Sequence, residues 1–188
     1  MSAPGGLRRA AIPLFVGGLL GFIGGYFAGG GGRPAAPAAA VASGGEQDSL
    51  GEVRKAVEKD PENPKLLTAL GNALYDREDW DGAVRAYEKA RRKAGSDPNL
   101  LSDLGAAYRN RGDFRKAIAC FEKARAADPD HWQSLLNLVL IEAFDTRDAS
   151  AARRHFEELK RRFPEMPNLD RIEKQIKDVG GGNPPARS

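Results

Sequence analysis

The chain has 188 residues but only one cysteine and two histidines, and this scarcity excludes several kinds of site. Cys120 is the single cysteine, so the chain forms no intramolecular disulfide. His131 and His155 stand far apart in the sequence, and together with Cys120 they match no recognised metal-ligand spacing. The sequence therefore predicts no metal site and no cofactor.

Catalytic motifs are also lacking. No glycine-rich phosphate loop follows a strand, because the glycines lie in an apolar N-terminal segment, at turns or at expected packing positions. The carboxylates are numerous but scattered, so no acid–base pair stands out. An enzyme with Cys120 as its nucleophile is an alternative, although the sequence shows no convincing base or cation beside this thiol. We therefore predict a protein that is not an enzyme.

The charge balance gives no sign of a nucleic-acid-binding protein. The chain has 29 basic and 26 acidic residues, for a net charge of +3. Within residues 46–179, however, 25 basic residues face all 26 acidic ones. The short basic clusters 91–93 and 160–162 stand near expected helix ends, where the helix dipole favours cations. No basic stripe indicates nucleic acid as a partner.

Residues 10–32 contain no charged side chain, and as a helix these 23 residues can cross a hydrocarbon core of about 30 Å. Arg8 and Arg9 precede this segment, and only Arg33 follows closely. The positive-inside rule then predicts a cytoplasmic N-terminus (residues 1–9) and a periplasmic remainder. We expect a single-pass signal-anchor in the inner membrane of a bacterial-type envelope. Cleavage after Ala40-Val41-Ala42, which resembles a signal-peptidase site, is the alternative.

Four glycines of the same segment recur at every fourth residue and would share one helix face. Small residues at this spacing let two membrane helices approach closely, which suggests self-association or pairing with another membrane subunit. The general abundance of glycine in the segment is the alternative explanation. The four residues are Gly17, Gly21, Gly25 and Gly29.

A 34-residue period dominates the rest of the chain. Six positions of the same type recur at this offset, which indicates a repeated structural unit. They are Leu67, Leu70, Gly71, Ala83, Tyr87 and Ala90, and then Leu101, Leu104, Gly105, Ala117, Phe121 and Ala124. The apolar spacing is helical, so the fold class is predicted to be all-α.

This pattern resembles tetratricopeptide repeats (TPR), in which each unit is a pair of antiparallel helices. The resemblance implies a TPR-type α-solenoid after one N-terminal transmembrane helix, with Gly71 and Gly105 where helices approach closely. The third unit departs from the pattern, because Val139 replaces the glycine and one residue is inserted near 145–148. The expected organisation is a linker 33–45, a half-repeat cap 46–63, repeats 64–97 and 98–131, a divergent repeat 132–164, a capping helix 165–179 and a disordered tail 180–188.

In this family the first helices of successive units line a concave groove that holds peptides or protein segments. Carried over to this sequence, the resemblance implies a partner-binding groove on three helices, with a solvated helix face as the alternative. Its residues are Lys65, Thr68, Asn72, Tyr75 and Asp76 in the first repeat, Asn99, Ser102, Asp103, Arg109 and Asn110 in the second, and Gln133, Leu136, Asn137, Leu140 and Phe144 in the third.

The sequence argues against a partner that binds through its terminal carboxylate. Chaperone-adaptor members of the family grip a terminal carboxylate with a lysine–asparagine–asparagine–lysine–arginine set. The matching positions lack every cation, so capture of this type is not expected; they are Thr68, Asn72, Ala106, Gln133 and Asn137. The apolar side chains at the third repeat suggest an anchor for a partner helix or strand, unless the helix at 168–179 packs over them.

The sequence thus favours a membrane-tethered TPR scaffold for protein–protein interaction or assembly at the cell envelope. An assembly factor that holds apocytochrome during cytochrome c maturation is the alternative, since membrane-tethered repeat proteins with this architecture act there. Nothing in the predicted groove singles out that client.

Overall fold

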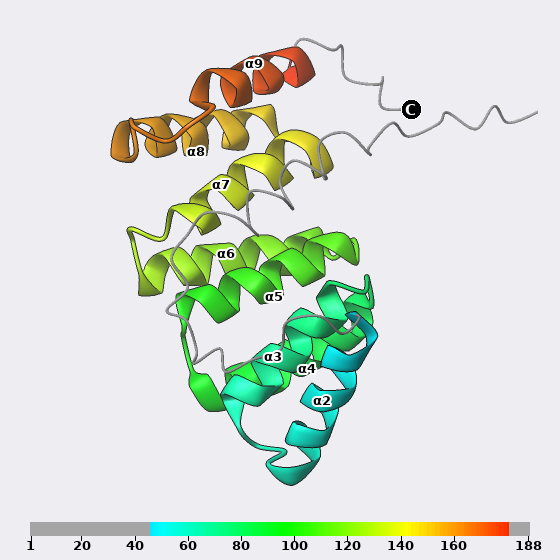
Figure 1. The fold of residues 1–188 in the computed structure, drawn as a ribbon. Coiled ribbons are helices and arrows are strands. Elements are labelled where there is room, and N and C mark those ends of the chain that lie inside the picture. The colour runs from blue at the N-terminus through cyan, green and yellow to red at the C-terminus, as the bar shows by residue number, and fades with distance from the viewer. Residues whose placement is uncertain (1–45, 181–188) are drawn as a thin grey trace, which may run out of the picture. The chain divides into compact units, whose positions relative to one another are not determined.

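The computed structural model describes residues 46–180, which are helical apart from short connections (Figure 1). The helices are α2 (Glu46–Lys59), α3 (Pro64–Tyr75), α4 (Trp80–Ala94), α5 (Pro98–Asn110), α6 (Phe114–Ala127), α7 (Trp132–Leu140), the π-helix η1 (Ile141–Asp145), α8 (Ala149–Arg162) and α9 (Leu169–Gly180). The predicted N-terminus, signal-anchor, glycine stripe and linker (residues 1–45) and tail residues 181–188 lie outside the described residues.

Three helix pairs follow one another along the chain. Helix α3 packs on α4, α5 on α6, and α7 on α8, while contacts between α4 and α5 and between α6 and α7 join successive pairs. Helix α2 precedes the first pair and packs on α3, and α9 follows the last pair and packs on α8. The predicted all-α repeat fold is therefore confirmed. Among residues 46–180, no helix combines the length and the apolar character needed to span a membrane.

The beginnings of the helices follow from local chemistry. Pro64 and Pro98 stand at the first helical positions of α3 and α5, where a missing N–H costs nothing. Asp79 caps α4, because its carboxylate accepts a hydrogen bond from the Gly82 N–H at 2.8 Å. Asp113 stands at the equivalent place before α6 but does not cap it, because its carboxylate binds the guanidinium of Arg111.

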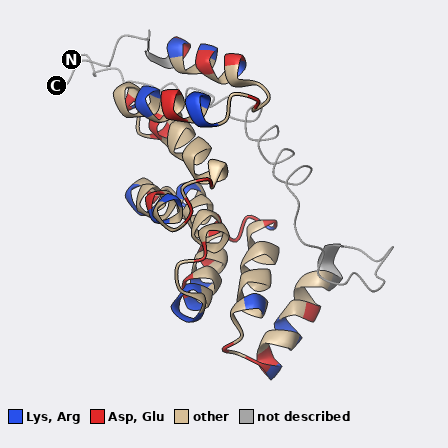
Figure 2. Cartoon of the chain, turned by 90° about the vertical axis from the view of Figure 1, so that its left-hand side faces the viewer, with Lys and Arg blue, Asp and Glu red and all other residues tan. Residues whose placement is uncertain are grey.

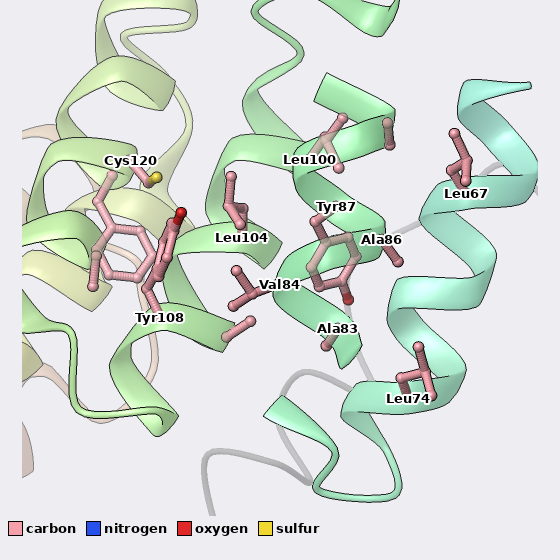
Figure 3. Close-up of a cluster of buried hydrophobic side chains, with 14 of the residues drawn as sticks. Leu67, Leu74, Ala83, Val84, Ala86, Tyr87, Leu100, Leu104, Tyr108 and Cys120 are labelled. Atoms are coloured by element: carbon pink, nitrogen blue, oxygen red, sulfur yellow. The ribbon is translucent and has the colours of Figure 1, made fainter. Parts of the chain in front are cut away.

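The glycine in each first helix allows the pair to close. A Cβ atom on Gly71 would lie 2.4 Å from Cε1 of Tyr87, and one on Gly105 would lie 2.6 Å from Cε1 of Phe121. Figure 3 shows Tyr87 within the cluster of buried side chains that includes Leu67 and Leu74 of α3. Both aromatic side chains are buried, with exposed fractions of 2% for Tyr87 and 0% for Phe121. Any side chain at these glycines would therefore push into a ring that has little room to move.

The third pair accommodates its inserted residue in a π-helical turn. Counted from the start of the first helix, the second helix begins one position later in this pair than in the two earlier pairs. The extra residue is absorbed at Ile141–Asp145, where the Thr146 N–H donates to the Ile141 carbonyl at 2.9 Å. Single π-helical turns of this kind accommodate one additional residue in a helix. The sequence located the insertion slightly further along, near residues 145–148.

Candidate protein-binding surface

The sequence-predicted groove residues occupy equivalent places on α3, α5 and α7–η1, and we call this surface the first-helix face. Its accessibility falls along the chain. Exposed members are Lys65, Asp76, Asn99 and Asn110; partly exposed members are Thr68, Asn72, Tyr75, Asp103, Arg109, Gln133 and Phe144; buried members are Ser102, Leu136, Asn137 and Leu140.

Polar groups of this face join successive first helices. The Asn110 amide donates to the Tyr75 hydroxyl at 2.7 Å, which links α5 to α3. Arg109 Nε donates to a carboxylate oxygen of Asp145 at 2.5 Å, which links α5 to η1. Burial raises the pKa of Tyr75, so its hydroxyl stays neutral at ordinary pH. These hydrogen bonds therefore stabilise the stack of repeats. They also occupy some of the donors and acceptors that the same side chains could otherwise offer to a ligand.

A third link involves His131, for which the sequence predicts no metal-binding role. Its Nε2 lies 3.3 Å from the side-chain oxygen Oδ1 of Asn99, and its Nδ1 accepts from the Ser134 N–H. Burial lowers the pKa of His131, which favours the neutral ring that these two bonds require. The sequence carried a signal for this role, because His131 occupies the place of the N-cap Asp97 one repeat period later.

Asn72 is also engaged within its own repeat. Its side-chain oxygen accepts a hydrogen bond from the buried Tyr87 hydroxyl at 2.7 Å. Thr68 in turn donates its hydroxyl to the Pro64 carbonyl at 2.8 Å. Asn72 belongs to the predicted groove, but the acceptor half of its amide already binds the Tyr87 hydroxyl. Removing it would leave a buried hydroxyl without its acceptor.

Asn137 differs from these residues, because none of the described residues hydrogen-bonds to its side chain. Its exposed fraction is only 5%. In the described region, Arg125 Nε is the only fully buried side-chain polar atom without a partner, so the Asn137 amide keeps some access to solvent. Gln133, one helical turn earlier on the same side of α7, is partly exposed and likewise makes no side-chain hydrogen bond with them. This neighbouring pair has unused donors and acceptors.

The apolar end of the face is smaller than the sequence suggested. Leu136 and Leu140 are buried, with exposed fractions of 7% and 3%, and only Phe144 remains partly exposed. Helix α9 packs against η1 as well as α8, with Leu169 and Ile176 buried. Helix α9 thus lies beside η1, and Phe144 is the remaining partly exposed apolar side chain of this face.

The surroundings of Cys120 do not support the alternative of an enzyme that uses this thiol as its nucleophile. Cys120 is buried, and burial together with the Glu88 carboxylate raises the pKa of its thiol to about 11. At neutral pH this thiol is almost entirely protonated, whereas a nucleophilic cysteine requires the thiolate.

Stacked antiparallel helix pairs with polar first-helix faces define a helical repeat protein. Two family models, both described as tetratricopeptide repeat, match residues 62–130 and 102–167. Residues 62–167 of this chain therefore belong to the tetratricopeptide repeat family, as the 34-residue period predicted. Such proteins are generally non-catalytic scaffolds for protein–protein interaction. No curated protein sequence matches the chain.

Solved structures share this fold. The TPR domain of Arabidopsis OM64 is 20% identical with a TM-score of 0.57, over 62% of this chain and 96% of that chain. The Sgt2 TPR domain from Aspergillus fumigatus is 26% identical with a TM-score of 0.57, over 66% and 87%. The TPR2B domain of yeast Sti1, in complex with pHsp70, is 19% identical with a TM-score of 0.55, over 72% and 99%.

Proposed function

We propose that this chain is a non-catalytic scaffold that binds a segment of a partner protein on the third-repeat part of its first-helix face. The observation that carries the proposal is the nearly buried Asn137, whose amide lacks a hydrogen-bond partner among the described residues. Its amide keeps some access to solvent and has unused donors and acceptors, which a bound segment can engage. The complex of yeast Sti1 TPR2B with pHsp70 supports protein binding by this fold.

The chemistry of the site limits the kind of partner. Gln133 and Asn137 can each donate and accept, so they suit the main chain of a partner segment in either direction. Phe144 adds one apolar contact. Arg109 is already paired with Asp145. The positions that match the carboxylate-binding residues of chaperone-adaptor members carry no cation. The expected partner is therefore a neutral segment with an apolar side chain, and not a terminal carboxylate.

The first test is the double substitution Gln133→Ala with Asn137→Ala. After the partner has been identified by affinity purification from detergent-solubilised membranes, its affinity should fall about tenfold or more. The loss of two hydrogen bonds costs about 1–3 kcal/mol. Unfolding should change little, because neither amide bonds to a described residue. Titration calorimetry with the partner segment measures the affinity.

The matched control removes two polar side chains from second helices, Glu122→Ala with Glu157→Ala, both of which are exposed. This pair should leave the affinity within about twofold of the unaltered chain. If the control abolishes binding while the amide pair does not, the partner uses the second helices and the proposed site is wrong.

We also propose that residues 10–32 hold the chain in the inner membrane, with the repeats on the periplasmic side. The support is the uncharged 23-residue segment after Arg8 and Arg9. A reporter fused after Ser188 should be active only outside the cytoplasm, and the chain should stay in the membrane pellet after a carbonate wash. A soluble chain that begins at Ser43 would show cleavage instead. Neither the first-helix face nor the comparisons favour apocytochrome as the client.

A further inference from the structure

The charges of the described region are segregated between its helices. The three second helices α4, α6 and α8 carry 14 basic and 5 acidic residues, whereas the remaining described residues carry 11 basic and 21 acidic ones. The nearly neutral total therefore combines a net charge of +9 on the second helices with −10 elsewhere. Figure 2 marks Lys and Arg in blue and Asp and Glu in red.

Six exposed cations define a surface that we call the outer basic face. None of them makes an ion pair or side-chain hydrogen bond within the described region, and each second helix contributes two, spaced by seven or eight residues. At 1.5 Å and about 100° per residue, this spacing puts the two about 10–12 Å apart along the helix, and about 20° apart around it on α4 or about 80° apart on α6 and α8. They are Arg85 and Arg92 on α4, Arg115 and Lys123 on α6, and Arg153 and Arg161 on α8.

Helix stability does not explain this charge. Cations in a last turn, such as Arg92 and Arg161, are favoured by the helix dipole. Arg115, however, stands in the first turn of α6, where the dipole opposes positive charge and the turn itself has no acidic residue. The mutual repulsion of such cations without ion-pair partners points to an anionic partner outside the domain.

We propose that the outer basic face docks on the anionic lipid headgroups of the membrane to which the chain is tethered. This inference rests on the proposed membrane tether, which would hold the repeats near the headgroups. The 13 residues between Gly32 and α2 span at most about 45 Å when extended. A tether of this length keeps the repeats close to the headgroups, so individually weak electrostatic contacts act at high effective concentration.

The same face is poorly suited to nucleic acid. Proteins that bind single strands place aromatic side chains among their cations to stack on bases. The exposed residues of α4, α6 and α8 include no aromatic side chain. The exposed Glu122 and Glu157 stand among the cations and would oppose tightly spaced phosphates, whereas a diffuse headgroup layer requires only a net positive face.

The test places a fluorescent probe on the outer basic face of the full chain. Ala119→Cys provides an exposed attachment point on α6, and Cys120→Ala removes the native thiol. Lys65→Cys in the same background places the control probe on the first-helix face. The chain is reconstituted in phosphatidylcholine vesicles with or without phosphatidylglycerol, and a headgroup spin label quenches any probe that reaches the surface.

Quenching of the probe at position 119 is expected with phosphatidylglycerol, and it should vanish in pure phosphatidylcholine or at high salt. The probe at position 65 should stay unquenched. Neutralising one cation per second helix should weaken docking about a hundredfold, because each basic residue near an anionic surface contributes about a factor of five. The variant is Arg85→Gln with Lys123→Gln and Arg153→Gln, and the charge-matched control is Lys55→Gln with Lys59→Gln and Lys174→Gln.

The outcomes separate the docking face from the tether. A chain that resists carbonate but shows no quenching at position 119 would overturn the docking face and leave the tether intact. A chain released by carbonate would end the tether proposal, while phosphatidylglycerol-dependent quenching at position 119 would still support the face. Equal quenching at positions 65 and 119, or equal losses in the two triple variants, would show attraction without a specific face and would overturn the inference.

Discussion

Replacing Gly105 with leucine is expected to lower the free energy of unfolding of residues 46–180 by about 1–3 kcal/mol. The reason is a steric conflict between the two helices of the second pair. A Cβ atom at this position alone would lie 2.6 Å from the ring of Phe121, whose side chain is fully buried. The ring and the helix that carries it must shift to admit a larger side chain. Urea unfolding followed by circular dichroism measures the change.

Gly51 provides the matched control, because it is also a helical glycine but has no atom within 4 Å of the place that a Cβ would occupy. Gly51→Leu should stabilise the domain slightly, since glycine is about 0.8–1.0 kcal/mol less favourable than alanine inside a helix and leucine is close to alanine. Glycine-to-leucine substitution is thus expected to lower the free energy of unfolding at position 105 and to raise it slightly at position 51. An unchanged midpoint for Gly105→Leu would show that the second helix pair is not closely packed at this glycine.

The repeat fold could be predicted because its signal is local and periodic. The small and aromatic residues at the 34-residue offset are the ones that pack between helices, as Gly71 and Tyr87 show. A pattern of this kind states which side of a helix is buried and where the partner helix comes closest. It needs no knowledge of contacts between distant segments, because each pair is made from neighbouring helices.

The candidate site could be predicted only in part, because the face of a helix does not determine how its polar groups are used. Asn72 lies where the pattern places it, yet its oxygen is engaged by Tyr87, which comes from the second helix. Arg109 likewise lies on the expected face, but its partner Asp145 follows the inserted residue of the third pair. Both bonds depend on side-chain geometry between helices, which spacing alone does not specify.

Burial of the apolar end and the charge segregation depended on longer-range structure. Leu136 and Leu140 are buried although the pattern places them on the groove, and their helix α7 packs on α5 and α6 of the preceding repeat as well as on α8 of its own pair. The nearly neutral total charge of the repeat domain gave no sign of the outer basic face. Only the assignment of charges to first and second helices revealed that the two signs are separated.

His155 and Glu142 form the other feature of the third pair that the repeat pattern did not predict. The Glu142 carboxylate accepts a hydrogen bond from, or shares a proton with, His155 Nδ1 at 2.7 Å. Their side chains have exposed fractions of 8% for Glu142 and 20% for His155. The equivalent positions hold apolar or weakly polar side chains in the earlier pairs, namely Leu74 with Ala86 and Tyr108 with Cys120.

Removing only the histidine is expected to destabilise the domain strongly. His155→Ala should lower the free energy of unfolding by about 3 kcal/mol, because the Glu142 carboxylate would stay buried without its partner. Restoring the side chains of the first pair, by His155→Ala with Glu142→Leu, should recover most of this loss. Replacing both partners of a buried hydrogen bond by apolar groups of similar shape can be nearly neutral for stability, or even stabilising.

A double-mutant cycle isolates the interaction between the two side chains. With Glu142→Leu as the second single variant, urea unfolding of all four proteins gives a coupling energy, which should be about 1–3 kcal/mol if the pair acts as a unit. Glu142→Leu alone should cost less than His155→Ala, because the more exposed histidine can still bind water. Single costs that simply add would show that Glu142 and His155 are independent of each other. The cycle therefore tests whether the third pair has replaced an apolar contact by a mutually dependent polar one.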